Sequence, residues 1–142
     1  MLIREMQWDD IDNGLLEVLS HLSQTEPIPP ESKAKIWNNL SNGENAMLVA
    51  IGTDGKVIGT GILIVTWKYL RGGVRAGRIS DVATHPDYEG RGIGSVIVKD
   101  LIRIAREKGC YKVTLKCSRK NRSWYERFGF KEDEVAMRLN LL

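Results

Sequence analysis

The stretch that decides the fold spans residues 85–110 and reads HPDYEGRGIGSVIVKDLIRIAREKGC. Three of its glycines, at positions 90, 92 and 94, stand directly before an amphipathic run that predicts a long helix over residues 92–108. A helix start presents about four backbone amides without partners and carries roughly half a positive charge, so it attracts phosphate. Glycine lets a phosphate approach the main chain closely. The stretch therefore predicts a phosphate-binding loop, with an ordinary flexible loop before a helix as the alternative.

The spacing of these glycines excludes two better-known phosphate motifs. The pattern G-x-x-x-x-G-K-[ST] is absent, and the glycines follow G-x-G-x-G where a dinucleotide-binding fold needs G-x-G-x-x-G after its first strand. Neither a nucleoside triphosphatase nor a Rossmann enzyme is indicated. Arg91 and Ser95 lie inside the run and offer side-chain donors to an anion.

Length and composition predict a single domain over residues 1–142, since 142 residues with 42% hydrophobic side chains suffice for one core. The net charge is +3, with acids and bases interspersed, so we expect acidic small molecules as partners rather than nucleic acid. The local excess of base comprises Lys68, Arg71, Arg75 and Arg78.

The N-terminal stretch lacks an apolar signal region, and the longest apolar stretch is far shorter than the ~20 residues that span a bilayer. We therefore expect a cytoplasmic protein without membrane contact. Cys110 and Cys117 flank a predicted strand, which holds them too far apart to form a disulfide. Both are interpreted as reduced thiols, and no metal-binding spacing is present.

Periodicity and turn residues predict the order β-α-α-β-β-β-α-β-α-β-β. The sequence TDG at residues 53–55 is typical of a tight hairpin turn between two apolar strands. The predicted strands cover 1–6, 46–51, 56–68, 75–84, 111–117 and a closing pair within 129–140. The predicted helices cover 8–22, 32–40, 92–108 and 119–127.

The glycine run and the segments around it resemble the GNAT superfamily of acyl-CoA-dependent N-acyltransferases, whose motif Q/R-x-x-G-x-G/A opens a helix after the fourth strand. Here residues 89–94 read EGRGIG. Within the superfamily, GRISDVATHPDYEGRGIGSVIV, GCYKVTLKCSRKNRSWYERFGF and EVAMRL resemble the glucosamine-6-phosphate N-acetyltransferases. The resemblance implies an α/β (α+β) fold with a mixed, mostly antiparallel sheet flanked by helices. It also implies a homodimer in which C-terminal strands meet the second subunit.

The resemblance places acetyl-CoA on two parts of the chain. Backbone amides of the glycine loop would bind the diphosphate, at Arg91, Gly92, Ile93, Gly94 and Ser95. The fourth strand would bulge and splay from the fifth, so that the pantetheine arm pairs with Val82, Ala83 and Thr84. Asn121 aligns with an asparagine near the cofactor.

Two catalytic roles follow from the same resemblance. The Val82 amide would donate to the oxyanion, and one lost donor of this kind typically costs about 3 kcal/mol. Tyr125 matches a tyrosine beside the sulfur and would protonate or hydrogen-bond the departing thiolate. The neighbouring Trp124, Phe128 and Phe130 have the spacing of a helix packing on a sheet, so we expect them in the core.

The acceptor is expected to be a primary amine that attacks the thioester directly, best represented by glucosamine 6-phosphate. The amine must lose a proton before it attacks, and Asp81 is the nearest candidate to remove it; the family carries an acidic pair here, and Ser80 replaces its first member. As a lone acid, Asp81 would alternatively orient the ammonium while water carries the proton, or else pair with an arginine. The substrate phosphate is expected to contact Lys68, Arg71 and Arg78, with a solvated charged hairpin as the alternative.

Two departures from the family pattern weaken the substrate prediction: Arg78 stands where the relatives have histidine, and Asn140 replaces a basic residue near the C-terminus. The cofactor motif also departs, because Glu89 replaces glutamine or arginine and places an anion near the phosphates, which would weaken coenzyme A binding slightly. The alternatives are therefore a different small amine, a protein amine, or a module that binds acyl-CoA without turnover.

Overall fold

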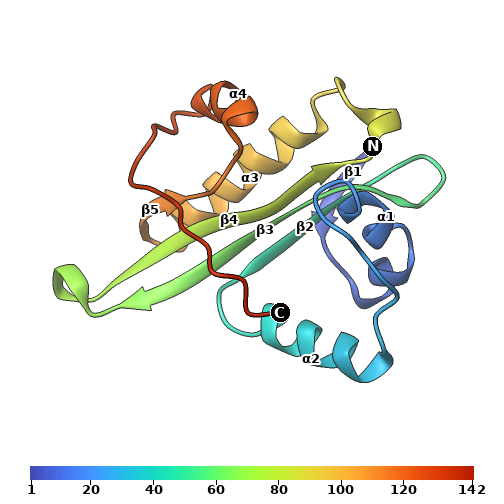
Figure 1. Ribbon diagram of the computed structural model, residues 1–142, viewed down its shortest axis with the longest axis horizontal. Helices are drawn as coiled ribbons and strands as arrows, with labels where there is room; N and C mark the ends of the chain where they lie inside the picture. Colours follow the sequence, from blue (N-terminus) through green and yellow to red (C-terminus); the bar gives the residue numbers. More distant parts are fainter.

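The computed structural model describes residues 1–142 and is built on a five-stranded sheet with strand order β1-β2-β3-β4-β5 (Figure 1). Neighbouring strands from β1 to β4 are antiparallel, and β5 runs parallel to β4. The mixed, mostly antiparallel sheet of the prediction is confirmed. The strands are β1 (Leu2–Glu5), β2 (Ala46–Ile51), β3 (Val57–Lys68), β4 (Val74–Thr84) and β5 (Cys110–Thr114).

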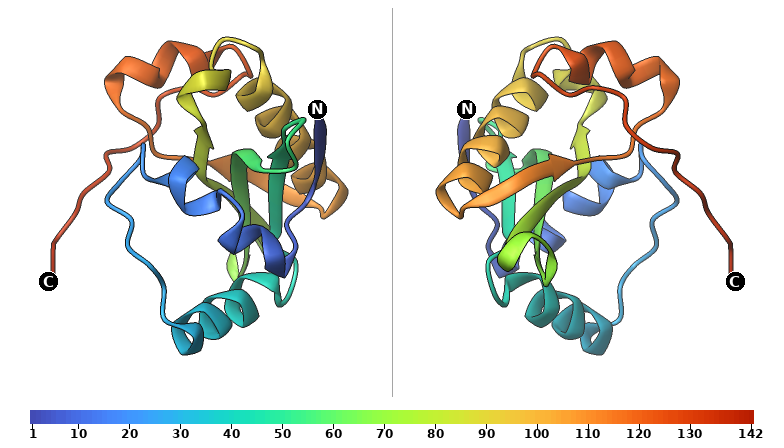
Figure 2. Two further views of the ribbon diagram at one scale, coloured as in Figure 1. Left: turned by 90° about the vertical axis from the view of Figure 1, so that its right-hand side faces the viewer. Right: turned by 90° about the vertical axis from the view of Figure 1, so that its left-hand side faces the viewer.

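Helices cover both faces of this sheet (Figure 2). One face carries α1 (Leu15–Leu19) and α2 (Pro30–Ser41), and the other carries α3 (Ile93–Glu107) with α4 (Arg122–Glu126) beyond it. Because both faces are covered, β2 reads as an unbroken apolar run whose side chains alternate between two cores. None of the helices has the length and apolar composition needed to cross a membrane.

Close contact between α3 and β3 fixes the helix that carries the glycine loop. A Cβ added at Gly59 would lie 2.9 Å from the Ile93 side chain, and one at Gly61 would lie 2.7 Å from the Ile97 side chain. Real Cβ atoms do not approach that closely, so both strand positions require glycine. The start of α3 is therefore held directly over the middle of the sheet.

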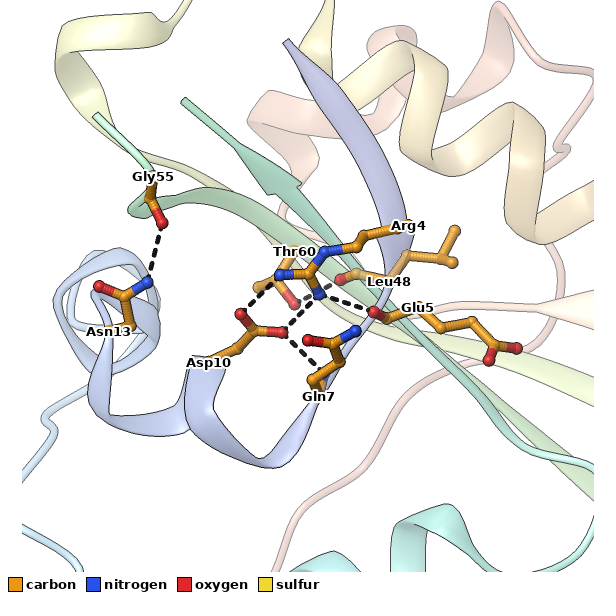
Figure 3. Close-up of polar contacts among 8 residues, drawn as sticks. All are labelled: Arg4, Glu5, Gln7, Asp10, Asn13, Leu48, Gly55 and Thr60. Atoms are coloured by element: carbon orange, nitrogen blue, oxygen red, sulfur yellow. Dashed lines mark hydrogen bonds and ion pairs between the residues drawn. The ribbon is translucent and has the colours of Figure 1, made fainter. Parts of the chain in front are cut away.

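The N-terminal strand is tied to the following turn by a bidentate ion pair (Figure 3). Arg4 donates to both carboxylate oxygens of buried Asp10, at 2.7 and 2.9 Å, and the Gln7 amide donates to the same carboxylate at 2.7 Å. The hydrogen bonds from Arg4 hold the pKa of Asp10 below its ordinary value. Nearby, the Asn13 side chain donates to the Gly55 carbonyl at 2.8 Å and joins this region to the β2–β3 turn.

Two predicted elements differ in the structure. The helix predicted over 8–22 is divided into a 3-10 turn, Trp8–Asp12, and the short α1, because Gly14 adopts a φ of +100° and lies against the β3 backbone. The closing strand pair predicted within 129–140 is absent from this chain. Residues 131–142 are exposed and extend away from the body (Figure 2), since no strand of the same chain lies beside them.

Candidate active site

The candidate site includes the part of β4 that has no paired strand on one side. Pairing between β4 and β5 covers Arg75 to Arg78, which is opposite Thr114, the last residue of β5. Because β4 continues to Thr84, its residues 79–84 present an edge without a strand partner on that side. Such an edge offers backbone donors and acceptors to an extended ligand.

A bulge in β4 lies within this open edge. Thr60 is opposite Ala83 and Ile62 is opposite Ser80, so the single residue Gly61 faces both Asp81 and Val82. Asp81 takes a φ of +54°, a left-handed conformation that aspartate tolerates better than most residues. The bulge therefore falls at the residues where the family resemblance implies one.

The glycine loop meets the requirements of an anion site at the start of a long helix. Gly90 and Gly92 have φ angles of +77° and +80°, and a Cβ at either would meet open space. No side chain caps α3, whose Val96 amide donates to the Gly92 carbonyl at 3.1 Å. The amides of residues 93–95 precede that bond and remain available to an anion.

Gly94 also has a packing role that its motif does not imply. A Cβ there would lie 3.3 Å from the Trp124 ring of α4 and 3.6 Å from the Thr84 hydroxyl at the end of β4. Gly94 therefore makes room for packing among three segments. The same contact brings the start of α3, the open end of β4 and helix α4 to one place.

Tyr125 lies on α4 beside this junction. Its ring is half-buried, in edge contact with Trp124 at 4.8 Å and with Phe130 at 6.1 Å between ring centroids. Its hydroxyl makes no hydrogen bond within the chain, and burial, with a smaller contribution from Cys117, raises its pKa. Tyr125 therefore stays protonated at neutral pH and can donate a proton. Trp124, Phe128 and Phe130 pack against the α3 core as expected, but they are only partly buried and lie at its margin.

Two further predicted cofactor residues lie at the exposed rim. The Arg91 guanidinium stacks on the Tyr88 ring at 5.0 Å, which holds its charge beside the glycine loop. Asn121 is exposed at the entry to α4, and its side chain makes no hydrogen bond within the chain. Both side chains are free to contact a ligand.

On the opposite side of the sheet from α3, Asp81 and Arg78 form no ion pair with any residue of the chain. The arginine pairing considered for Asp81 is therefore absent. Asp81 follows Arg78 by three residues, so the two positions lie about 10 Å apart along β4. A charged ligand of that length would meet an acid at one end and a base at the other.

The structure does not bring Lys68 and Arg71 to this position. Lys68 pairs with Val74, seven residues before Asp81, which places it roughly 20 Å away along β4. The tip of the β3–β4 hairpin lies still farther out (Figure 1). Arg71 belongs to this tip, and its guanidinium lies over the Tyr111 ring. The remaining base of the group, Arg75, is bound to Glu44.

His85, to which the sequence assigns no role, has two hydrogen-bond partners in the structure. Its Nδ1 accepts a hydrogen bond from the Asp87 amide at 3.1 Å, so Nε2 carries the proton and donates to Glu17 at 3.2 Å. The contact joins the end of β4 to α1. The signal available in the sequence was the histidine directly before Pro86, a position from which a side chain can cap the turn that follows.

The comparison with known proteins decides the family. Residues 8–130 match the acetyltransferase (GNAT) family. This chain belongs to the GNAT family. It is therefore an acetyltransferase, and the predicted fold class is confirmed.

Relatives within the GNAT family match almost the whole chain. Glucosamine 6-phosphate N-acetyltransferase of Trypanosoma brucei brucei is 36% identical to this chain. The alignment covers 98% of this chain and 95% of the trypanosomal protein. A probable glucosamine 6-phosphate N-acetyltransferase of Oryza sativa subsp. japonica is 34% identical, with 95% of this chain and 84% of its own covered.

Solved structures agree with these relatives. Glucosamine-6-phosphate N-acetyltransferase of Arabidopsis thaliana superposes with a TM-score of 0.92 at 29% identity, over 99% of this chain and 97% of its own. An acetyltransferase of Trypanosoma brucei gives a TM-score of 0.93 at 35% identity, over 99% of each chain.

Proposed function

We propose that this protein transfers the acetyl group of acetyl-CoA directly to the amine of glucosamine 6-phosphate. The observation that carries the proposal is the open, bulged edge of β4 beside the uncapped start of α3. The family membership and the names of the similar T. brucei and O. sativa enzymes support the substrate.

In the proposed complex, acetyl-CoA binds along two backbone surfaces. The diphosphate accepts hydrogen bonds from amides of Arg91 to Ser95, where the positive end of the α3 dipole favours negative charge. The pantetheine arm pairs with Val82, Ala83 and Thr84 and takes the place of the missing strand. Asn121 donates to the cofactor from the opposite rim.

The chemistry requires a neutral amine, although an alkylammonium is largely protonated at pH 7. Asp81 orients the ammonium, and water carries its proton away. The amine nitrogen then bonds to the carbonyl carbon while the Val82 amide stabilises the oxyanion. The carbon–sulfur bond breaks, and the thiolate takes a proton from Tyr125, whose raised pKa keeps it protonated. Neither cysteine takes part.

The acceptor lies between the two unpaired charges on β4. Arg78 binds the phosphate, since a guanidinium fork suits that anion, and Asp81 binds the amine end. Lys68 and Arg71 of the same subunit lie too far along the hairpin to contact a single sugar phosphate. We propose that they contribute to the positive potential that attracts the substrate.

We also propose that the protein is a homodimer formed through its C-terminal tail. Val135, Met137, Leu139 and Leu141 alternate with other residues along the tail and are 83–86% exposed, which is the pattern of a strand without a sheet. The outer edge of β5 is unpaired, and a groove of about 250 Å³ beside it is lined by Val113, Phe128 and Phe130. The tail of a second copy suits that groove.

Both cysteines are free, which suits a reducing compartment, and we propose the cytoplasm as the place of action.

Release of coenzyme A thiol, measured with a panel of amines, tests the proposed reaction. We expect release that depends on glucosamine 6-phosphate and falls strongly with glucosamine, which lacks the phosphate. Glucose 6-phosphate, which lacks the amine, should give only background. Binding of acetyl-CoA without amine-dependent release by any member of the panel would overturn the enzymatic proposal and leave a module that binds acyl-CoA.

A further inference from the structure

The chain between the two proposed cofactor surfaces makes a 3-10 turn, Pro86–Tyr88, whose start is capped by His85. The Asp87 amide donates to Nδ1 of His85 at 3.1 Å, and the Tyr88 amide donates to the His85 carbonyl at 2.9 Å. The open edge of β4 precedes this turn, and the glycine loop follows it. The turn therefore sets how the loop lies relative to that edge.

His85 is itself held by two other parts of the chain. Its backbone amide donates to the Ile58 carbonyl of β3 at 2.8 Å. Its Nε2 lies 3.2 Å from a carboxylate oxygen of Glu17 on α1. Because Nδ1 accepts from the Asp87 amide, Nε2 carries the proton and donates to Glu17, which fixes the orientation of the ring. His85 is therefore anchored to α1, to β3 and to the turn.

Ring contacts connect His85 to the glycine loop. The His85 and Tyr88 rings meet edge to face, with their centroids 6.0 Å apart. The Arg91 guanidinium lies 5.0 Å from the centre of the Tyr88 ring, which is half-buried and packs against the core beneath α3. Arg91 is exposed and forms no ion pair in the chain, so its contact with Tyr88 is what orients its charge.

The charge of Glu89 makes this orientation more important. Glu89 stands two residues before Arg91, is exposed and forms no ion pair. Its carboxylate is unfavourable beside a bound diphosphate. A guanidinium held in place next to it offsets that charge and can bind the diphosphate through two parallel hydrogen bonds.

We propose that His85 is a positioning residue that sets the preference of the enzyme for acyl-CoA over acyl-pantetheines without a diphosphate. His85 holds the Tyr88 ring, the ring holds the Arg91 guanidinium, and the guanidinium binds the diphosphate. His85 acts through these two side chains and not on the reacting atoms. The inference rests on the proposed acetyl-CoA site.

Kinetics with three acetyl carriers and saturating glucosamine 6-phosphate test this role. Acetyl-CoA and acetyl-dephospho-CoA both have the diphosphate, whereas S-acetylpantetheine lacks it. We expect His85→Ala to raise the KM of the two longer carriers about fivefold, and to leave kcat and the kcat/KM for S-acetylpantetheine within about twofold of the wild-type values. A structural defect would impair all three carriers alike, so this difference distinguishes positioning from folding.

His85→Asn is a milder variant that tests the same contact. Asparagine can still accept from the Asp87 amide, because it is a favoured capping residue, but it lacks the ring that contacts Tyr88. We expect a rise of about threefold in the KM of acetyl-CoA, again with no change for S-acetylpantetheine. This variant retains the capped turn, so it tests the proposal even where His85→Ala does not fold.

A double-mutant cycle shows whether His85 acts through Arg91. Arg91→Ala should raise the KM of acetyl-CoA about tenfold, through loss of one charge-assisted contact. Adding His85→Ala should then raise it by less than about twofold more, because the side chain that His85 positions is gone. Asn45→Ala is the matched control: it removes the acceptor of the Val65 amide, at 2.9 Å in another part of the sheet, and should leave the KM of every carrier unchanged.

The outcomes separate this inference from the proposed function. Equal losses with all three carriers, an unchanged KM in both His85 variants, or full additivity with Arg91→Ala would each overturn the positioning role. Turnover of glucosamine 6-phosphate by the wild-type chain leaves the proposed function standing in all three cases. A wild-type chain that releases no thiol with any amine overturns the proposed function; isothermal titration of coenzyme A then tests His85 directly, with binding about fivefold weaker expected in His85→Ala. Equal affinities would overturn the positioning role there too.

Discussion

Among single residues, Tyr125 combines a hydroxyl that is proposed to donate a proton with a ring that is half-buried. Burial raises its pKa, so the phenol is protonated at neutral pH, and its hydroxyl has no competing partner in the chain. Its ring meanwhile packs on Trp124 and Phe130. A substitution that keeps the ring and removes the hydroxyl therefore separates catalysis from packing.

Tyr125→Phe should lower kcat about a hundredfold, in the range typical of general acid catalysis, with the KM for acetyl-CoA unchanged. The wild-type rate should fall along an alkaline limb above pH 10, because the raised pKa moves loss of the proton beyond the ordinary value. That limb should vanish in the variant. Steady-state thiol release from pH 7 to 11 measures both effects. An unchanged rate in Tyr125→Phe would remove the leaving-group role.

Asp10 contributes to stability rather than to catalysis. The hydrogen bonds from Arg4 lower its pKa in the folded chain, so its stabilisation is present above the unfolded value of about 3.9 and is lost as pH falls through the lower, folded value. Asp10→Asn should cost about 2 kcal/mol at pH 7 and reduce the loss of stability in acid. Urea unfolding between pH 2 and 7 measures this. The exposed Asp9→Asn is the control; equal effects of the two changes would contradict the account.

At the scale of elements, local sequence patterns predict well the segments whose structure is set by their own residues. They predict poorly the segments whose structure depends on contact with another part of the chain. The long helix was predicted over 92–108 and is found at Ile93–Glu107. The helix predicted over 8–22 is interrupted at Gly14, where a Cβ would lie 3.0 Å from the Val57 carbonyl oxygen. That approach of two segments is not visible in the sequence.

Distance along a strand explains the other weakness of the sequence reasoning. Lys68, Arg71 and Arg78 stand close in the sequence, but a strand rises about 3.3 Å per residue, so only Arg78 remains near Asp81. The glycine loop and the bulge were predictable because a family motif marks them. The apolar cavity of about 230 Å³ between α1, α2 and the sheet was not predictable, since its walls come from five separate segments of the chain.

The start of α3 provides a prediction with a matched control. Gly92 and Gly43 both have a φ of +80°, and a Cβ at either position would meet open space, but only Gly92 lies in the phosphate loop. Alanine at either position should cost about 1 kcal/mol of stability through the same backbone strain. Gly92→Ala should also weaken coenzyme A binding about tenfold, whereas Gly43→Ala should not. Equal affinities of the two variants in isothermal titration would contradict the loop's role.

At the scale of the whole molecule, the C-terminal tail extends away from the body (Figure 2), and its apolar side chains are exposed. The closing strands that the sequence predicted need a partner edge, and this chain alone supplies none beside the tail. A second copy would complete the sheet and bury the exposed residues. The proposed assembly would therefore account for the missing part of the predicted fold.

Deletion of residues 134–142 should convert a dimer into a monomer. Sedimentation equilibrium of the full chain at micromolar concentration should give twice the chain mass of 16.0 kDa, and the shortened chain should give a single mass. The deletion removes exposed residues only, so the remaining core should retain its circular dichroism. A full chain that sediments as a monomer would contradict the proposed assembly.

The central claim is that backbone donors at the start of α3 and the open edge of β4 hold one cofactor between them. A crystal structure of the chain with acetyl-CoA tests it most directly. We predict the diphosphate within hydrogen-bonding distance of amides between Arg91 and Ser95, with the thioester carbonyl accepting from the Val82 amide. A cofactor bound at any other surface would contradict the claim.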